Sequence, residues 1–160
     1  MAVNKHQSSN AGTHEWVTPR DILDPLGDFD LDPCAPKVRP WDCAKHSYTI
    51  DDDGLAKPWF GRVWCNPPYG RFATPFVLKM SQHKEGLLLV FVRTETKLWQ
   101  QVILPTCHSI RLLDWRPTFH YTNGKAGPGN CGGPMCLVSW NEEDTVIAKR
   151  LGGVTVKPML

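Results

Sequence analysis

One apolar run constrains the fold of this chain more than any other feature. Residues 86–92 read Gly-Leu-Leu-Leu-Val-Phe-Val, without a single polar side chain. A strand with one face in solvent alternates polar and apolar residues, so this run predicts a central strand that is covered on both faces. A polar loop follows at Arg93–Thr96, and apolar residues at helical spacing then occupy 98–103.

The order strand, polar loop, helix recurs along the chain. Residues 28–36 and 62–65 read as strands, and 72–80 has the apolar spacing of a helix. Two further strand candidates lie at 109–115 and 135–140. This alternation predicts a single compact α/β domain with a mostly parallel sheet and an antiparallel hairpin at the C-terminal end.

The two ends of the chain are expected to lie outside this domain. Residues 1–14 are polar and aperiodic, which predicts a disordered tail, and 152–160 read as a second tail after a last helix at 142–151. The domain is therefore expected over residues 15–151. No apolar run reaches the length of a membrane span and no secretion signal is recognisable, so we expect a cytoplasmic protein that does not enter membranes.

Composition also limits the chemistry of the chain. The six cysteines are expected to be reduced thiols, and because none form close Cys-x-x-Cys pairs, we expect no metal site. A formal net charge of +2 is too small to indicate nucleic-acid binding by itself. Any contact with DNA must therefore use a local basic patch.

The strand at 62–65 ends in an unusual tip, Asn66-Pro67-Pro68-Tyr69. Two prolines fix two φ angles and remove two backbone donors, so Asn66 is held in one orientation where the strand stops. Its side-chain oxygen and a neighbouring backbone carbonyl form a pair of acceptors, and Tyr69 offers a flat ring beside them. This combination predicts a pocket for a planar group that carries an NH2.

Two acidic segments lie where a ligand would be expected. Asp32 follows a strand, and ligands of open α/β sheets gather beyond the carboxyl ends of strands, although an ordinary Asp-Pro turn is the alternative. The run Asp51-Asp52-Asp53 is either a solvated acidic loop or a carboxylate for the hydroxyls of a ribose. From the residues alone, both the structural and the functional interpretation remain possible for each of the two segments.

Two other segments have a structural and a functional interpretation. Thr18 before Pro19 predicts an N-cap for a short helix, and Trp16 beside it favours a cap that faces a ligand. The glycine-rich stretch 124–134 is either a mobile hairpin loop or a flexible flap that carries Arg116, His120 and Lys125 toward a partner.

Several of these segments, in the same order, resemble the small phage-type DNA N6-adenine methyltransferases. The resemblance covers roughly residues 15–140 and rests on Glu15-Trp16-x-Thr18-Pro19, Phe29-Asp30-Leu31-Asp32-Pro33-Cys34-Ala35, Asp53-Gly54-Leu55, Gly61 to Arg71 around Asn66-Pro67-Pro68-Tyr69, and Arg93-Thr94-Glu95-Thr96. It implies a Rossmann-like methyltransferase domain that uses S-adenosylmethionine. If phage-encoded, the protein would work in the host cytoplasm.

The resemblance also implies roles for residues. Asn66 and the Pro67 carbonyl would bind the adenine amine, with Pro68 completing the motif and Tyr69 stacking on the base. The residues implied at the cofactor are Trp16, Thr18, Pro19, Asp32, Pro33, Cys34 and Ala35, with Asp52 or Asp53 at the ribose. Like the small phage-type proteins that it resembles, the chain has no Gly-x-Gly in the segment implied as the cofactor loop.

The substrate implied is DNA, read without a separate recognition domain. Arg71, Arg93, Arg116 and Lys125 are the candidates for phosphate contacts, and we expect a monomer by default. The alternatives are a methyltransferase for cytosine N4, RNA adenine or glutamine, and a DNA- or nucleotide-binding module without catalysis.

Overall fold

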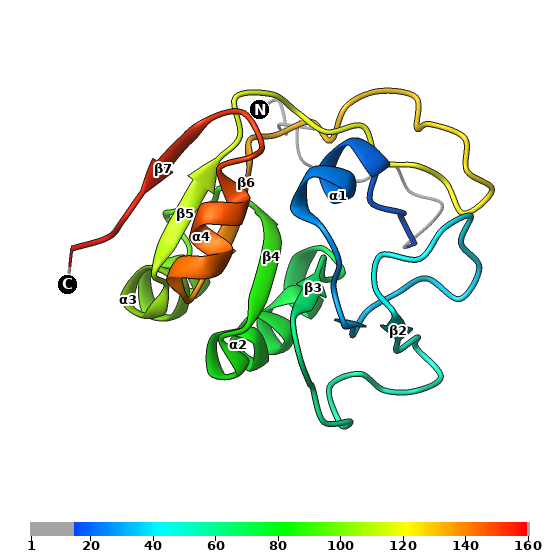
Figure 1. The fold of residues 1–160 in the computed structure, drawn as a ribbon, viewed down its shortest axis with the longest axis horizontal. Coiled ribbons are helices and arrows are strands. Elements are labelled where there is room, and N and C mark those ends of the chain that lie inside the picture. The colour runs from blue at the N-terminus through cyan, green and yellow to red at the C-terminus, as the bar shows by residue number, and fades with distance from the viewer. Residues whose placement is uncertain (1–14, 160) are drawn as a thin grey trace, which may run out of the picture.

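The computed structural model describes residues 15–159, and a single sheet of seven strands organises them (Figure 1). The strands lie in the order β2-β1-β3-β4-β6-β5-β7. Their bounds are β1 Leu31–Asp32, β2 His46–Ser47, β3 Val63–Cys65, β4 Gly86–Phe91, β5 Ser109–Leu112, β6 Met135–Ser139 and β7 Val154–Val156.

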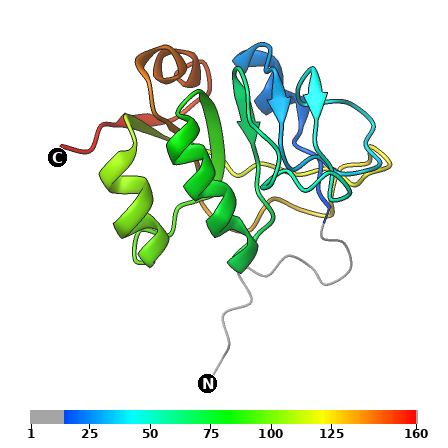
Figure 2. The ribbon, with the colours of Figure 1, turned by 90° about the horizontal axis from the view of Figure 1, so that it is seen from below.

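Helices cover both faces of this sheet (Figure 2). On one face lie α1 (Arg20–Leu26) and α4 (Glu142–Ala148), whose apolar side chains join one core cluster. On the other lie α2 (Ala73–His83) and the helical segment formed by η2 (Trp99–Ile103) and α3 (Leu104–Thr106). A single 3-10 turn, η1 (Gly70–Phe72), leads from the end of β3 into α2.

Strand β4 confirms the prediction of a central strand buried on both faces. It is the fourth of the seven strands, and its side chains alternate between the two cores. Leu87 and Leu89 pack with α1 and α4, whereas Leu88 and Val90 pack with α2 and η2. This double burial explains why the run contains no polar residue.

The prediction of a mostly parallel sheet is wrong. The pairs β1–β2, β1–β3 and β3–β4 are parallel, but β4–β6, β5–β6 and β5–β7 are antiparallel. A parallel connection needs a crossover, and the chain between β5 and β6 contains no helix. β6 therefore runs back along β5, which confirms the antiparallel hairpin, and it also inserts between β5 and β4.

A buried ion pair joins the ends of several elements. The Arg62 Nε donates to Asp144 Oδ1 at 2.7 Å, and the Gly86 amide donates to Asp144 Oδ2 at 2.7 Å. Arg62 also donates to the carbonyls of Leu26 and Asp28, and its guanidinium lies 4.2 Å from the Phe29 ring centroid. The ion pair of Arg62 and Asp144 thus links α1, β3, β4 and α4.

The C-terminal end of the domain differs from the predicted bound. The tail predicted at residues 1–14 lies outside the described residues. Residues 152–160, predicted as a loose tail, contribute β7, which pairs with β5 and forms one edge of the sheet. Within residues 15–159, no helix is long and apolar enough to cross a membrane.

Candidate active site

The predicted site residues lie at the carboxyl edge of the sheet. Strands β1, β3, β4 and β5 run in the same direction, so the loops after them meet at one edge. Asp32 ends β1, Asn66 follows β3 and Arg93 lies two residues beyond β4. The long connection from β5 to β6 passes over the same edge.

Thr18 holds the side chain of Asn66. The Thr18 Oγ1 accepts a hydrogen bond from Asn66 Nδ2 at 3.3 Å and another from Trp64 Nε1 at 3.3 Å. Because an indole nitrogen only donates, this contact requires the threonine oxygen to act as an acceptor. The prediction of Thr18 as a helix cap is wrong, since α1 begins after Pro19 without a side-chain cap. Thr18 orients the amide instead.

This orientation leaves two acceptors open at the tip. Asn66 Oδ1 is buried and has no hydrogen-bond partner among the described residues. In residues 15–159, no backbone amide donates to the Pro67 carbonyl either. A buried acceptor without a donor, such as Asn66 Oδ1, costs free energy. Together with the Pro67 carbonyl, it could accept hydrogen bonds from a ligand that carries two N–H bonds.

Tyr69 lies beside these acceptors in an aromatic group. Its ring centroid is 5.0 Å from that of Phe91 and 6.3 Å from that of Phe119, the latter at an interplanar angle of 78°. The side chain is half-buried, and its hydroxyl is buried without a partner in the described part of the chain. Burial raises the pKa of Tyr69, so the phenol stays neutral.

Asp32 and Cys34 form the loop next to this tip. Asp32 is 4% exposed, its Oδ1 accepts from the Cys34 amide at 3.0 Å, and burial raises its pKa to about 6. The Cys34 thiol donates to the Asn66 carbonyl at 3.2 Å. Its contact with Cys65 and its burial raise the pKa of Cys34 well above the ordinary value, which keeps this donor protonated.

The acidic segment packs directly against the Asp32 loop. The Tyr48 amide donates to the Asp32 carbonyl at 2.8 Å, and the Ala35 amide donates to the Tyr48 carbonyl at 2.9 Å. A Cβ on Gly54 would lie 2.0 Å from the carbonyl oxygen of Pro33, so only glycine permits this approach. The structure therefore brings the two predicted parts of a cofactor site together.

The three acidic side chains of this segment are bound differently. Asp51 pairs with Lys37 at 2.7 Å, and Asp52 pairs with Lys57 at 2.7 Å while its other oxygen accepts from Thr49. Asp53 accepts from the Leu55 amide through Oδ1, whereas its Oδ2 makes no hydrogen bond or ion pair within residues 15–159. Asp53 also has a left-handed φ of 51°. Such backbone strain concentrates at functional sites.

The connection from β5 to β6 is hydrogen-bonded to the start of the domain. Val17 and His120 exchange two backbone hydrogen bonds, at 2.9 and 3.0 Å, and the Gly127 amide donates to the Phe119 carbonyl. Trp16 lies 4.9 Å from Tyr121 between ring centroids, and a Cβ on Gly127 would crowd the Trp16 ring. Residues 117–127 of this connection are thus folded against the site, and they include only the first part of the stretch 124–134 that was predicted as a mobile loop or a flap.

The four basic residues predicted to meet DNA lie in the loops of this edge. Arg71 follows the tip and stacks on the Phe72 ring at 5.0 Å, and Arg93 pairs with Glu95 at 3.1 Å. Arg116 and Lys125 lie in the connection between β5 and β6. All four are exposed.

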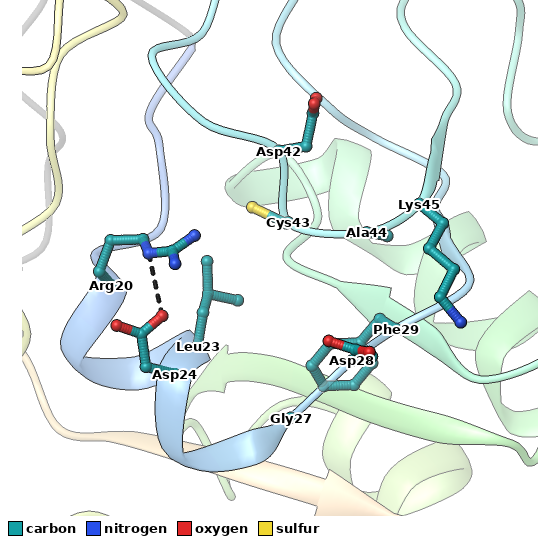
Figure 3. Close-up of a pocket in the computed structure, with 10 residues that line it drawn as sticks. All are labelled: Arg20, Leu23, Asp24, Gly27, Asp28, Phe29, Asp42, Cys43, Ala44 and Lys45. Atoms are coloured by element: carbon teal, nitrogen blue, oxygen red, sulfur yellow. Dashed lines mark ion pairs between the residues drawn. The ribbon is translucent and has the colours of Figure 1, made fainter.

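A separate cavity of about 320 Å³ lies beside α1 (Figure 3). Its walls come from α1, from residues 27–29 and from residues 42–45, and the Arg20–Asp24 ion pair of 2.9 Å lies along it. None of the residues predicted to be catalytic or to bind a cofactor lines this cavity.

The sequence patterns missed several residues that build the site. Trp41 donates to the Thr18 carbonyl at 2.9 Å, and the Cys43 thiol lies close enough to Asp32 for that carboxylate to raise its pKa, after the larger effect of burial. Phe119 packs on Tyr69. These residues lie in irregular segments, where no periodicity indicates which side chains face inward.

Comparison with known proteins identifies the family. No curated protein and no solved structure matches this chain. The family model described as DNA N-6-adenine-methyltransferase (Dam) matches residues 5–148, which include every element of the site described above. The chain therefore belongs to the DNA N-6-adenine-methyltransferase (Dam) family.

Proposed function

We propose that this protein transfers a methyl group from S-adenosylmethionine to the N6 amine of adenine in DNA, within a Rossmann-like domain. The observation that carries the proposal is the pair of open acceptors, Asn66 Oδ1 and the Pro67 carbonyl, next to the half-buried ring of Tyr69. An adenine amine has two N–H bonds and a planar ring, which this arrangement matches. Family membership supports the same reaction.

The two acceptors would activate the amine. Its lone pair is delocalised into the ring, and hydrogen bonds to both N–H groups favour the pyramidal form, in which the lone pair is free to attack. Thr18 fixes the amide so that its oxygen, rather than its nitrogen, faces the substrate. Such a mechanism needs no side chain to act as a strong general base.

The methyl donor would lie between the Asp32 loop and the acidic segment. When bound, S-adenosylmethionine supplies an electrophilic methyl group on its sulfonium. We assign its methionine part to the loop at Asp32, Pro33, Cys34 and Ala35, flanked by Trp16, Thr18 and Pro19. Of the two ribose candidates, Asp53 fits better than Asp52, because Asp53 retains an oxygen without a partner in the described chain, whereas both oxygens of Asp52 are bound.

DNA would approach the same edge. Arg71, Arg93, Arg116 and Lys125 would contact phosphates, which gives affinity without sequence information. An adenine in a duplex must be flipped out before its amine can enter the pocket, and Tyr69 would replace part of the lost stacking.

A direct test compares the wild type with Asn66→Ala. The protein is incubated with labelled S-adenosylmethionine and unmethylated duplex DNA, and the modified nucleoside is identified by mass spectrometry after digestion. We expect N6-methyldeoxyadenosine from the wild type and no transfer from Asn66→Ala, while both bind S-adenosylhomocysteine with similar affinity. Full turnover by Asn66→Ala, or methyl groups on cytosine, would refute the proposal. Gln82→Ala, which removes an exposed amide side chain on α2, is the matched control.

A further inference from the structure

Lys79 makes an unusual set of contacts on α2. Its ammonium donates to the carbonyls of Gly54, Leu55 and Lys57, so all three of its N–H bonds meet backbone oxygens of one short turn. It makes no ion pair with a carboxylate in residues 15–159, and it lies 5.3 Å from the Trp59 ring centroid. Burial lowers the pKa of Lys79, which the nearby Asp53 partly offsets. A surface lysine would keep these three bonds with water.

The turn that accepts hydrogen bonds from Lys79 begins directly after Asp53. The Gly54 carbonyl accepts from Lys79 and also from Trp59 Nε1, the latter at 2.7 Å. Gly54 in turn rests against the Pro33 carbonyl. Lys79 therefore fixes the segment that carries Asp53 and holds this segment in contact with the Asp32 loop.

We propose that Lys79 is a positioning residue, which holds Asp53 where its carboxylate accepts hydrogen bonds from the ribose hydroxyls of the methyl donor. The inference rests on the proposed function. Asp53 has a left-handed φ of 51°, and contacts of the residues that follow it hold the turn in this conformation. Lys79 supplies three of them from a rigid helix, and this helix starts just after the catalytic tip.

The experiment measures how strongly the protein prefers a ligand with both ribose hydroxyls over one that lacks them. Calorimetry gives the affinity for S-adenosylhomocysteine and for its analogue without the 2′ and 3′ hydroxyls. We expect the wild type to prefer the hydroxylated ligand by about tenfold or more, since hydrogen bonds to a charged group are among the stronger ones. Lys79→Met should lose most of this preference, whereas a general loss of structure would weaken both ligands equally.

Three further variants make the test specific. Asp53→Asn should lose the preference as well, and the double variant with Lys79→Met should lose no more than either single one. Lys79→Arg should be intermediate, because a planar guanidinium cannot meet three clustered carbonyls as an ammonium does. Lys149→Met, at an exposed lysine after α4, should keep the wild-type preference. The folded fraction of each variant is checked by circular dichroism.

Each result bears on a different step. A wild type that binds neither ligand refutes the proposed function and this inference with it. A wild type that binds both equally refutes the placement of Asp53 at the ribose, and with it the role of Lys79. If the wild type prefers the hydroxylated ligand and Lys79→Met or Lys79→Arg retains the full preference, the inference alone is overturned.

Discussion

The thiol of Cys34 donates a hydrogen bond to the main-chain carbonyl of Asn66 at 3.2 Å. This contact joins the loop after β1 to the tip after β3, two segments more than thirty residues apart in the sequence. It couples the part of the site assigned to the methyl donor with the part assigned to the adenine. Displacement of the Asn66 main chain would therefore move one reacting group relative to the other.

The first prediction concerns this thiol. Cys34→Ala removes the donor, so we expect turnover to fall by about tenfold or more, because small misplacements of reacting groups are costly. Cys34→Ser restores a donor and should recover part of the loss. Methyl transfer to DNA at saturating cofactor measures the effect. Cys107→Ser, in the core behind η2, is the control, and an unchanged turnover in Cys34→Ala would contradict the coupling.

The second prediction concerns Thr18. Thr18→Val keeps the shape of the side chain but leaves Trp64 Nε1 and Asn66 Nδ2 without their acceptor. We expect a loss of about 1–3 kcal/mol in the free energy of unfolding, measured with urea, together with a lower turnover. Thr18→Ser retains the oxygen and should stay near the wild type in both measurements. Equal behaviour of the two variants would show that the hydroxyl does not orient the amide.

Much of this architecture is predictable because it follows local rules. The run 86–92 marks a doubly covered strand, and Asn66 to Tyr69 marks the end of another. The position of β6 is not predictable in this way, since its insertion between β4 and β5 depends on a long connection without periodicity. Strand β2 has two residues, too few for a pattern, and of residues 28–36, predicted as a strand, only Leu31–Asp32 form β1. Thr18 fits a cap by residue type, and only tertiary contacts show its other role.

The third prediction tests the ion pair of Arg62 and Asp144. Their side chains are 17% and 3% exposed, and loss of one partner leaves a buried charge. We expect Asp144→Asn to lower the free energy of unfolding by about 3–5 kcal/mol. The control is Arg20→Met, because the Arg20–Asp24 pair is more than half exposed and should contribute less than about 1 kcal/mol. Similar losses in both variants would contradict the structural role of Arg62.

The fourth prediction follows from the buried carboxyl of Asp32. Burial raises its pKa from 3.8 to about 6 in the folded protein, so its neutral form is favoured by folding. This contribution to stability is complete below pH 4 and is lost as the pH rises through about 6. Over this range, the free energy of unfolding of the wild type falls by roughly 3 kcal/mol because of Asp32. Asp32→Asn cannot ionise and lacks this dependence. Its stability relative to the wild type, in the absence of ligand, should therefore rise between pH 4 and pH 7, as measured by urea unfolding.

The last prediction concerns the basic residues at the carboxyl edge. A phosphate contact releases a counterion, so the logarithm of DNA affinity falls linearly with the logarithm of salt concentration. Arg116→Ala should weaken binding to all DNA sequences alike and reduce this slope by about 1. Lys125→Ala should do the same, because both side chains are exposed and lie in the connection that covers the site. The matched control is Arg150→Ala, an exposed arginine after α4 whose Nη1 donates to the Pro25 carbonyl, away from this edge. Fluorescence anisotropy with a labelled duplex gives the slopes, and an equal slope in Arg116→Ala and Arg150→Ala would place the DNA elsewhere on the molecule.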